Sequence, residues 1–328
     1  SVLSYKHHLI RELEHTRKSA FAPSTWSNLR TQWKAYLEFC TLASLFPCPL
    51  SPLKLSLFAQ HLSSKVKSPA TVANYLSGVR SLSLIAGGDP PPLSHPLIKY
   101  TLTGLKRIMK HVPKRASPIT PQILREVFHL LDFSNSLHCS FWSFCLLSFY
   151  LLTRKSNMVP TKQSAFNPTF QLCWSDIVRS DQAAIVSLKW SKTNQFSTRE
   201  IKIPLLANPN SCLCPINALK LMARINGGVP SQSPFSYVHK GSTQILTYPV
   251  ALSMLRTVIF ATGRNGRLFS CHSLRRGGAS FAYVSGLRDL DIQILGDWRS
   301  DCYKIYLQGS VQDRIRSAAK IRDAISNS

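Results

Sequence analysis

The chain has 328 residues, of which 44% are hydrophobic and 10% aromatic, so it is long enough for two domains with hydrophobic cores and too apolar for an intrinsically disordered protein. Its 40 Lys and Arg outnumber its 15 Asp and Glu, and a net charge of +25 favours a polyanionic partner such as a nucleic acid. The excess is shared: residues 1–117 carry 16 basic and 4 acidic side chains, and residues 118–328 carry 24 and 11. We therefore expect both halves to face one nucleic acid, the alternative being a basic surface that only aids solubility.

The first 110 residues predict a bundle of short helices. Ser51, Ser68 and His95 each precede a proline, which is typical of a capped helix start, because the side chain binds a free N–H and proline lacks one. Apolar residues at helical spacing indicate one further helix. The predicted helices span residues 24–40, 53–62, 70–85 and 97–109.

The polar face of this bundle is basic. Few acidic residues accompany its cations, which favours contact with phosphates over an ordinary solvated surface. The cations are Arg30, Lys34, Lys65, Lys67, Arg80, Lys106, Arg107 and Lys110.

A basic linker with two prolines occupies residues 110–118 and ends the bundle. The sequence therefore predicts two domains, residues 1–117 and residues 118–328.

The second domain begins with helices, predicted over residues 120–131, with Thr120 as the cap, and over residues 137–153. The second of these is strongly apolar. It is shorter than the roughly 20 residues of a membrane span, and polar residues such as His138 interrupt it. We interpret it as a buried core helix and expect no membrane association.

Further along, the pattern changes to that of a β-hairpin. Residues 184–190 and 199–204 are rich in strand formers, residues 193–197 join them, and helical patterns return from residue 215. The predicted fold class is mainly α with a small antiparallel β-sheet. The nine cysteines lack the spacing of a zinc site or a disulfide framework, which indicates reduced, intracellular thiols.

Two basic residues of the second domain stand out, although each is a weak signal when taken alone. Arg154 follows the apolar helix, where an arginine is costly unless it is paired or positioned for a ligand; the alternative is a surface arginine whose stem covers apolar neighbours. Lys192 lies at the tip of the predicted hairpin. Taken alone, such a lysine is an ordinary solvated side chain.

The segment from Cys271 to Gly278 carries His272 and Arg275, which share one face of a helix and can hold one phosphate between them. The alternative is an ordinary basic helix. Gly277 and Gly278 lower helix stability, so they indicate close packing against another backbone.

A final motif combines Gly296, a helix C-cap candidate, with Trp298 and two tyrosines, Tyr303 and Tyr306. Ser300 or Asp301 fits the start of the helix that carries the tyrosines. A tyrosine in an amphipathic helix is normally a core residue.

Together and in this order, these residues resemble the tyrosine recombinases, the phage-type integrases and related DNA strand-exchange enzymes. The resemblance covers residues 118–310, with the most specific match at His-Ser-Leu-Arg-Arg-Gly and Leu-Gly-Asp-Trp. It is strongest to recombinases of DIRS-like and Crypton-like eukaryotic mobile elements. It implies a helical core-binding domain followed by a mixed α/β catalytic domain.

The resemblance implies that Tyr306 attacks the scissile phosphate and forms a 3′-phosphotyrosyl link. Arg154 and Arg275 would stabilise the phosphate oxygens in the transition state.

In the same way, His272 would assist proton transfer from the tyrosine, Lys192 would protonate the leaving 5′-oxygen, and Trp298 would pack where many relatives have histidine. No cofactor and no metal are expected, because one phosphodiester is exchanged for another.

Three positions depart from the family pattern. Counting back from Tyr306 places Asp297 at the His/Trp position, but we favour Trp298, because an aspartate would repel the phosphate. Asn157 stands where many relatives have an acidic residue, which loosens the positioning of the first arginine. Tyr303 is the alternative nucleophile.

The expected function is that of a site-specific DNA recombinase acting in the nucleus on double-stranded DNA, as a homodimer on inverted half-sites and a tetramer at synapsis. A type IB topoisomerase-like enzyme and an inactive, domesticated DNA-binding protein are the alternatives. The amphipathic segment over residues 312–325 either closes the domain's own core or docks on a neighbouring subunit.

Overall fold

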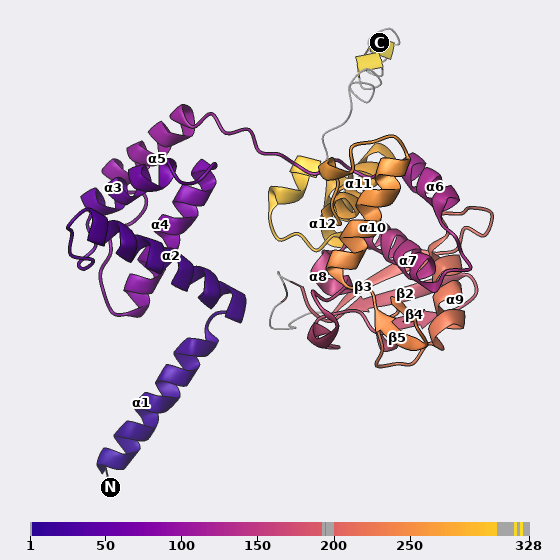
Figure 1. Cartoon of the computed structure of the whole chain (residues 1–328), viewed down its shortest axis with the longest axis horizontal. Helices are drawn as coiled ribbons and strands as arrows, with labels where there is room; N and C mark the ends of the chain where they lie inside the picture. Colours follow the sequence, from indigo (N-terminus) through magenta and orange to yellow (C-terminus); the bar gives the residue numbers. More distant parts are fainter. Residues whose placement is uncertain (1, 192–193, 195–199, 307–317, 320–321, 324–328) are drawn as a thin grey trace. The chain divides into compact units, whose positions relative to one another are not determined.

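The computed structural model describes all residues except 1, 192–193, 195–199, 307–317, 320–321 and 324–328. The chain forms two compact units, Ser1–Lys114 and Arg115–Ser328, so the division lies three residues before the predicted position. The described part is mainly helical with small antiparallel sheets, as the sequence predicts (Figure 1). None of its helices combines the length and hydropathy that crossing a membrane requires.

The first unit consists of helices (Figure 1). They are α1 (Val2–Ser19), α2 (Pro23–Leu42), α3 (Pro52–Ser63), α4 (Pro69–Ile85) and α5 (Pro96–Ile108). The last four enclose one apolar core, with Tyr36, Phe58 and Leu76 at its centre. Their bounds confirm the four predicted helices within two residues, whereas α1 was not predicted.

Proline at the first helical positions starts each of these four helices, where its missing N–H costs nothing. Ser51 and His95 accept the predicted cap hydrogen bonds, from the backbone N–H of Lys54 and Leu97. The cap predicted at Ser68 is wrong, because this side chain makes no cap hydrogen bond.

The second unit surrounds a larger core. Its helices are α6 (Pro121–Leu130), α7 (Ser136–Tyr150), α8 (Lys155–Met158), α9 (Pro215–Asn226), α10 (Tyr248–Ala261), α11 (His272–Val284) and α12 (Asp289–Leu295). Short 3₁₀ turns are η1 (Gln163–Ala165), η2 (Trp174–Asp176), η3 (Gly266–Leu268) and η4 (Asp301–Tyr306). Its strands are β1 (Ile177–Arg179), β2 (Ala183–Leu188), β3 (Ile201–Leu206), β4 (Ser236–His239) and β5 (Ser242–Ile245).

Helix α7 is the centre of this unit. Every residue from 139 to 149 is buried, and α7 packs against α9, α11 and β4, which confirms the expected core helix. It is shorter than predicted, because the chain leaves the helix after Tyr150 and Leu152 adopts a left-handed φ of 48°.

The predicted hairpin is present as β2 and β3, which pair antiparallel with Ile185 opposite Pro204. The short strand β1 extends it to a three-stranded sheet in the order β1-β2-β3, and β4 pairs with β5 in a separate hairpin. The sequence did not predict β1, β4 or β5. Strands of three or four residues are too short for an alternating pattern to stand out.

The two glycines of α11 let this helix lie directly on other backbone segments. A Cβ on Gly277 would lie 1.8 Å from the carbonyl oxygen of Ile119, and one on Gly278 would lie 2.1 Å from that of Phe149. This confirms the predicted close approach. It also places the middle of α11 beside Phe149, near the end of α7.

Gly278→Ala is therefore expected to destabilise the second unit by about 2–3 kcal/mol, because backbone atoms must move to admit the methyl group. Gly104→Ala in α5 is the matched control: nothing lies within 4 Å of its Cβ position, so this change should stabilise the first unit by about 0.5–1 kcal/mol. Thermal unfolding of each variant measures both effects. Equal stability of Gly278→Ala and the wild type would contradict the close approach.

Candidate active site

Arg154 lies in the turn that connects α7 with α8. It is the N-cap residue of α8, it is partly exposed, and its carbonyl oxygen accepts a 2.9 Å hydrogen bond from the Asn157 N–H. The left-handed residue Leu152 ends α7 early, so the turn between α7 and α8, rather than the end of α7, carries this arginine.

His272 and Arg275 lie one turn apart at the start of α11, as predicted. His272 is exposed, whereas Arg275 is only 3% exposed. The Arg275 guanidinium donates to the carbonyl oxygens of Leu152 and, at 2.7 Å, of Gly296. A buried arginine is costly unless its N–H groups are paired, so these two carbonyls hold its charge in one place, between α7 and α12.

Trp298 lies against this guanidinium, with its ring centre 3.9 Å from Arg275 Cζ, a cation–π contact. The ring also covers Gly296, where a Cβ would lie 1.7 Å from the tryptophan Cζ3. Gly296 is the C-cap of α12, as predicted, but its φ is −89°. The tryptophan ring, not a left-handed turn, therefore requires glycine here.

The left-handed residue of this turn is Asp297, with a φ of 50°. Its carboxylate is buried and accepts a hydrogen bond from the hydroxyl of Ser191, which directly precedes Lys192. Ser191 also forms an isolated β-bridge with Asn194. Asp297 thus connects the turn of Trp298 to the hairpin of Lys192, although Lys192 itself lies outside the described residues.

Asn157 makes a second connection to this hairpin. Its side-chain amide is buried and donates to the carbonyl oxygen of Trp190. A carboxylate at this position would have no proton to donate when ionised. The contacts of Asn157, Ser191 and Asp297 were not predicted, because each joins segments far apart in the sequence.

The two candidate nucleophiles belong to η4, which begins at Asp301, one of the two predicted start residues, but is a 3₁₀ helix. Tyr303 is buried in a small apolar cluster with Leu152 and Trp298, its ring 5.8 Å from the tryptophan ring. It therefore occupies a core position. Tyr306 is the last residue of η4, and its side chain lies outside the described residues.

Cations are concentrated around His272. Desolvation and the charges of Arg275, Arg154, Arg276 and Lys155 lower its pKa below the usual 6.5. The imidazole is therefore neutral at pH 7 and can accept a proton. The same cations suit a phosphate.

Lys155 was not among the predicted site residues. Its ammonium lies 3.1 Å from the centre of the Tyr248 ring, at the start of α10. Its position next to Arg154 was the available signal, but two adjacent cations do not by themselves distinguish a site from a basic surface.

No protein-family model and no curated protein matches this sequence. Solved structures do match. The Tn1549 transposon integrase in complex with circular intermediate DNA is 11% identical, with a TM-score of 0.55 over 94% of this chain and 97% of that chain. A lambda integrase dimer bound to a COC′ core site is 18% identical, with a TM-score of 0.54 over 92% and 94%.

The XerH site-specific recombinase in a post-cleavage complex with a difH substrate is 14% identical, with a TM-score of 0.54 over 86% of this chain and 75% of that chain. The chain has the tyrosine recombinase fold. The matches extend over both units, so the first unit shares the likeness that the sequence showed only for the second.

Within the tyrosine recombinase fold, four of the six predicted site residues are described and meet at one place: Arg154, His272, Arg275 and Trp298. The other two predicted site residues are Lys192 and Tyr306. Lys192 and the side chain of Tyr306 lie outside the described residues. Among the residues that the structure describes, no group of three or more His, Cys, Asp or Glu side chains is arranged to hold a metal ion.

Most of the tail predicted to be amphipathic, residues 312–325, lies outside the described residues. Its two interpretations, closing its own core or docking on a neighbour, stay predictions.

Proposed function

We propose that this chain is a site-specific DNA recombinase or integrase that cuts and rejoins DNA through a 3′-phosphotyrosine intermediate. The observation that carries the proposal is the position of Arg275, held between two carbonyls over Trp298 and close to Arg154 and His272. The fold is shared with recombinases and integrases whose structures contain DNA. A concentrated set of fixed cations is what a phosphoryl-transfer transition state requires.

Tyr306 is the proposed nucleophile. Its phenolic oxygen forms a bond to the scissile phosphorus while the bond from phosphorus to the 5′-oxygen breaks. Arg154 and Arg275 stabilise the negative charge on the non-bridging oxygens.

Two protons move in this step. Neutral His272 accepts the tyrosine proton, and Lys192 donates a proton to the departing 5′-oxygen. Rejoining is the reverse, with a 5′-hydroxyl of another strand as the attacking group. Each step exchanges one phosphodiester for another, so we propose that neither ATP nor a metal ion takes part.

The proposed partner is double-stranded DNA, bound by a core-binding domain, residues 1–117, and a catalytic domain, residues 118–328. We propose a homodimer on inverted half-sites and a tetramer at synapsis. Lambda integrase, which shares the fold, has been solved as a dimer on a core site and as a tetramer on a Holliday junction, the latter with a TM-score of 0.51. The net charge of +25 supports the same partner.

We place this activity in the nucleus, on the likeness of the motifs to recombinases of eukaryotic mobile elements. Fluorescence microscopy tests this assignment: a fluorescent fusion of the full chain should accumulate in the nucleus of a eukaryotic cell.

The test is a suicide-substrate assay with nicked DNA from the flanks of the chain's own genomic copy, labelled at either end of the cleaved strand. A denaturation-resistant protein–DNA band that keeps the label upstream of the cut supports a 3′-phosphotyrosine. Relaxation of supercoiled DNA without strand exchange would favour the topoisomerase alternative. Tight binding without a covalent band would favour an inactive DNA-binding protein.

Strand cleavage is expected to depend on the neutral form of His272. Because the pKa of His272 is lowered below its usual 6.5, the decline in rate as the imidazole takes up a proton should be centred below pH 6.5. His272→Gln should slow cleavage by roughly 10²-fold or more and remove this decline. Single-turnover rates from about pH 5 to 8 measure it. A decline centred above 6.5 would contradict the lowered pKa.

Ser191→Ala is expected to slow cleavage about tenfold while the unit loses about 1.5–3 kcal/mol of stability, because a buried hydrogen bond to the Asp297 carboxylate, which holds the Lys192 hairpin, is lost. A substrate with a 5′-bridging sulfur isolates the cause, since a thiolate leaves without a proton. The variant should cleave this substrate at the wild-type rate. Equal slowing on both substrates would argue against a link to Lys192.

A further inference from the structure

Lys155, the first residue of α8, is held in place by an aromatic ring rather than by an acid. Its ammonium lies 3.1 Å from the centre of the Tyr248 ring. The side chain is exposed, and no carboxylate of the described residues forms an ion pair with it. A lysine loses side-chain entropy when it is fixed in one position. Because the ring already fixes this ammonium, an anion that binds it has less entropy left to pay for.

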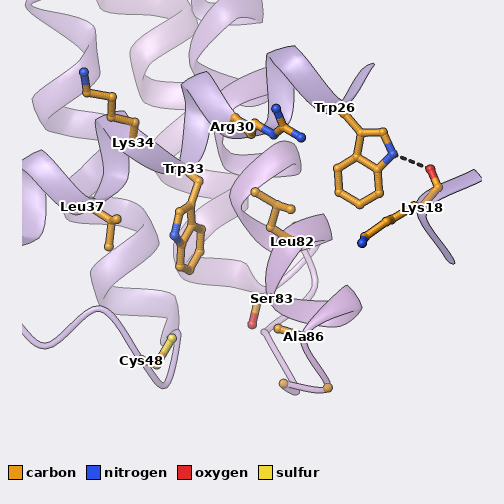
Figure 2. A pocket seen from close by; sticks show the side chains of 12 residues that line it. Lys18, Trp26, Arg30, Trp33, Lys34, Leu37, Cys48, Leu82, Ser83 and Ala86 are labelled. Atoms are coloured by element: carbon orange, nitrogen blue, oxygen red, sulfur yellow. Dashed lines mark hydrogen bonds between the residues drawn. The ribbon is translucent and has the colours of Figure 1, made fainter. Parts of the chain in front are cut away.

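Other lysines of the chain are fixed by acids instead. Lys220 lies 2.8 Å from Asp181 in the second unit. In the first unit, Lys34 borders a largely apolar groove (Figure 2), and its ammonium lies 4.0 Å from Glu38. In such pairs the carboxylate occupies the ammonium. The face of a ring leaves the N–H groups of Lys155 that point away from it able to donate to a further anion.

Lys155 lies beside the candidate active site but apart from Arg275. It is one of the four cations that lower the pKa of His272, and its effect is the smallest of the four. Burial raises the pKa of the Cys271 thiol to about 12, and Lys155 is the main charge that opposes this rise. Lys155 therefore lies near the start of α11 and against α10, whereas Arg275 lies over Trp298, which follows α12.

We infer that Lys155 binds the DNA phosphate next to the scissile phosphate and that Tyr248 is its positioning residue. The inference rests on the proposed function, because it takes the scissile phosphate to be held by Arg154 and Arg275. Lys155 and Arg275 are held by different rings on different elements. Two charges placed in this way suit two phosphates of one strand better than a single phosphate, since each phosphate carries its own charge.

The test is binding to uncleaved duplex from the flanks of the chain's own genomic copy, measured by mobility shift over a series of salt concentrations. Lys155→Met should weaken binding about tenfold and make the slope of log K against log salt shallower by about one. Lys155→Arg keeps the charge and should keep the slope. The matched control is Lys220→Met, at the opposite end of β2 from the hairpin of Lys192, and it should bind within about twofold of the wild type.

Duplexes with a single neutral methylphosphonate locate the phosphate. At the position that Lys155 contacts, this change should weaken binding by the wild type but not by Lys155→Met, because the variant has already lost the contact. Arg154→Met should show the same loss of effect at the scissile phosphate, one position away.

The role of Tyr248 is tested in the same assay. Tyr248→Leu should weaken binding by the wild type about two- to fivefold, because the ammonium loses the ring that holds it. The same change should have no further effect in Lys155→Met. Tyr248→Phe keeps the ring and should bind as the wild type does. Wild-type binding by Tyr248→Leu would show that the ring does not position Lys155.

Four results would each overturn the phosphate contact. They are a wild-type chain that does not bind this DNA, unchanged affinity and salt slope in Lys155→Met, an equal loss on every methylphosphonate duplex, and coupling of Lys155 and Arg154 to the same phosphate. None of these measurements requires cleavage. A missing covalent complex would therefore count against the 3′-phosphotyrosine chemistry, while coupling of Lys155 to its own phosphate would still support the contact.

Discussion

Replacing Tyr306 by phenylalanine is expected to abolish the covalent protein–DNA complex, lowering cleavage by roughly 10⁴-fold or more, because the side chain loses the oxygen that attacks phosphorus. Tyr303→Phe should cleave within about threefold of the wild type, since it keeps the ring that packs on Trp298. Denaturing gels of the nicked-substrate reaction measure both variants.

A mobility-shift assay on uncleaved DNA is the control, because both variants should bind as the wild type does. Loss of the covalent band in Tyr303→Phe, with retention in Tyr306→Phe, would move the nucleophile to Tyr303. That result would also require the cluster of Leu152, Trp298 and Tyr303 to open when DNA binds.

Arg275→Ala is expected to lose both cleavage and stability. The carbonyl oxygens of Leu152 and Gly296 would lose their donor and Trp298 its cation, which should cost about 2–5 kcal/mol in the free energy of unfolding. Arg275→Lys separates the two effects. It keeps a charge but lacks the planar fork, so it should recover part of the stability while cleavage stays at least about 10²-fold lower.

Thermal unfolding and single-turnover cleavage test this second prediction. The control is Arg288→Ala, whose exposed ion pair with Asp291 should be worth no more than about 1 kcal/mol. If Arg275→Lys cleaved DNA at the wild-type rate, a positive charge alone would suffice at this position, and the planar guanidinium held between the two carbonyls would not contribute to catalysis.

The helices of the first unit show how far local signals reach. A proline after a polar residue predicted α3 to α5, and apolar residues at helical spacing alone predicted α2, in each case within two residues. These signals act between residues within about one helical turn of each other, so they can be recognised in the sequence. Helix α1 has no such start signal, and its apolar residues have no counterpart in its own bundle.

In the candidate site, too, relations between residues close in sequence could be predicted, whereas contacts between distant segments could not. His272 and Arg275 share a helix and a motif, so their relation follows from a spacing of three residues. Only the resemblance to tyrosine recombinases made candidates of Arg154, Lys192 and Tyr306. Taken alone, such residues are ordinarily a surface arginine, a solvated lysine and a core tyrosine. The hydrogen bond between Ser191 and Asp297 joins residues 106 apart, and no local pattern predicts such a contact.

From sequence alone, the chain could be recognised as basic and mainly helical, with a buried helix before Arg154 and two glycines where α11 meets other backbones. These features could be predicted because helical periodicity, helix capping and the small size of glycine depend on single residues or on residues close together in the sequence. The burial of Arg275 between Leu152 and Gly296, the left-handed turns at Leu152 and Asp297 and the core position of Tyr303 emerged only once the chain was folded. Each depends on atoms brought together from distant segments, and the energy of such contacts is set by packing and desolvation rather than by spacing along the chain.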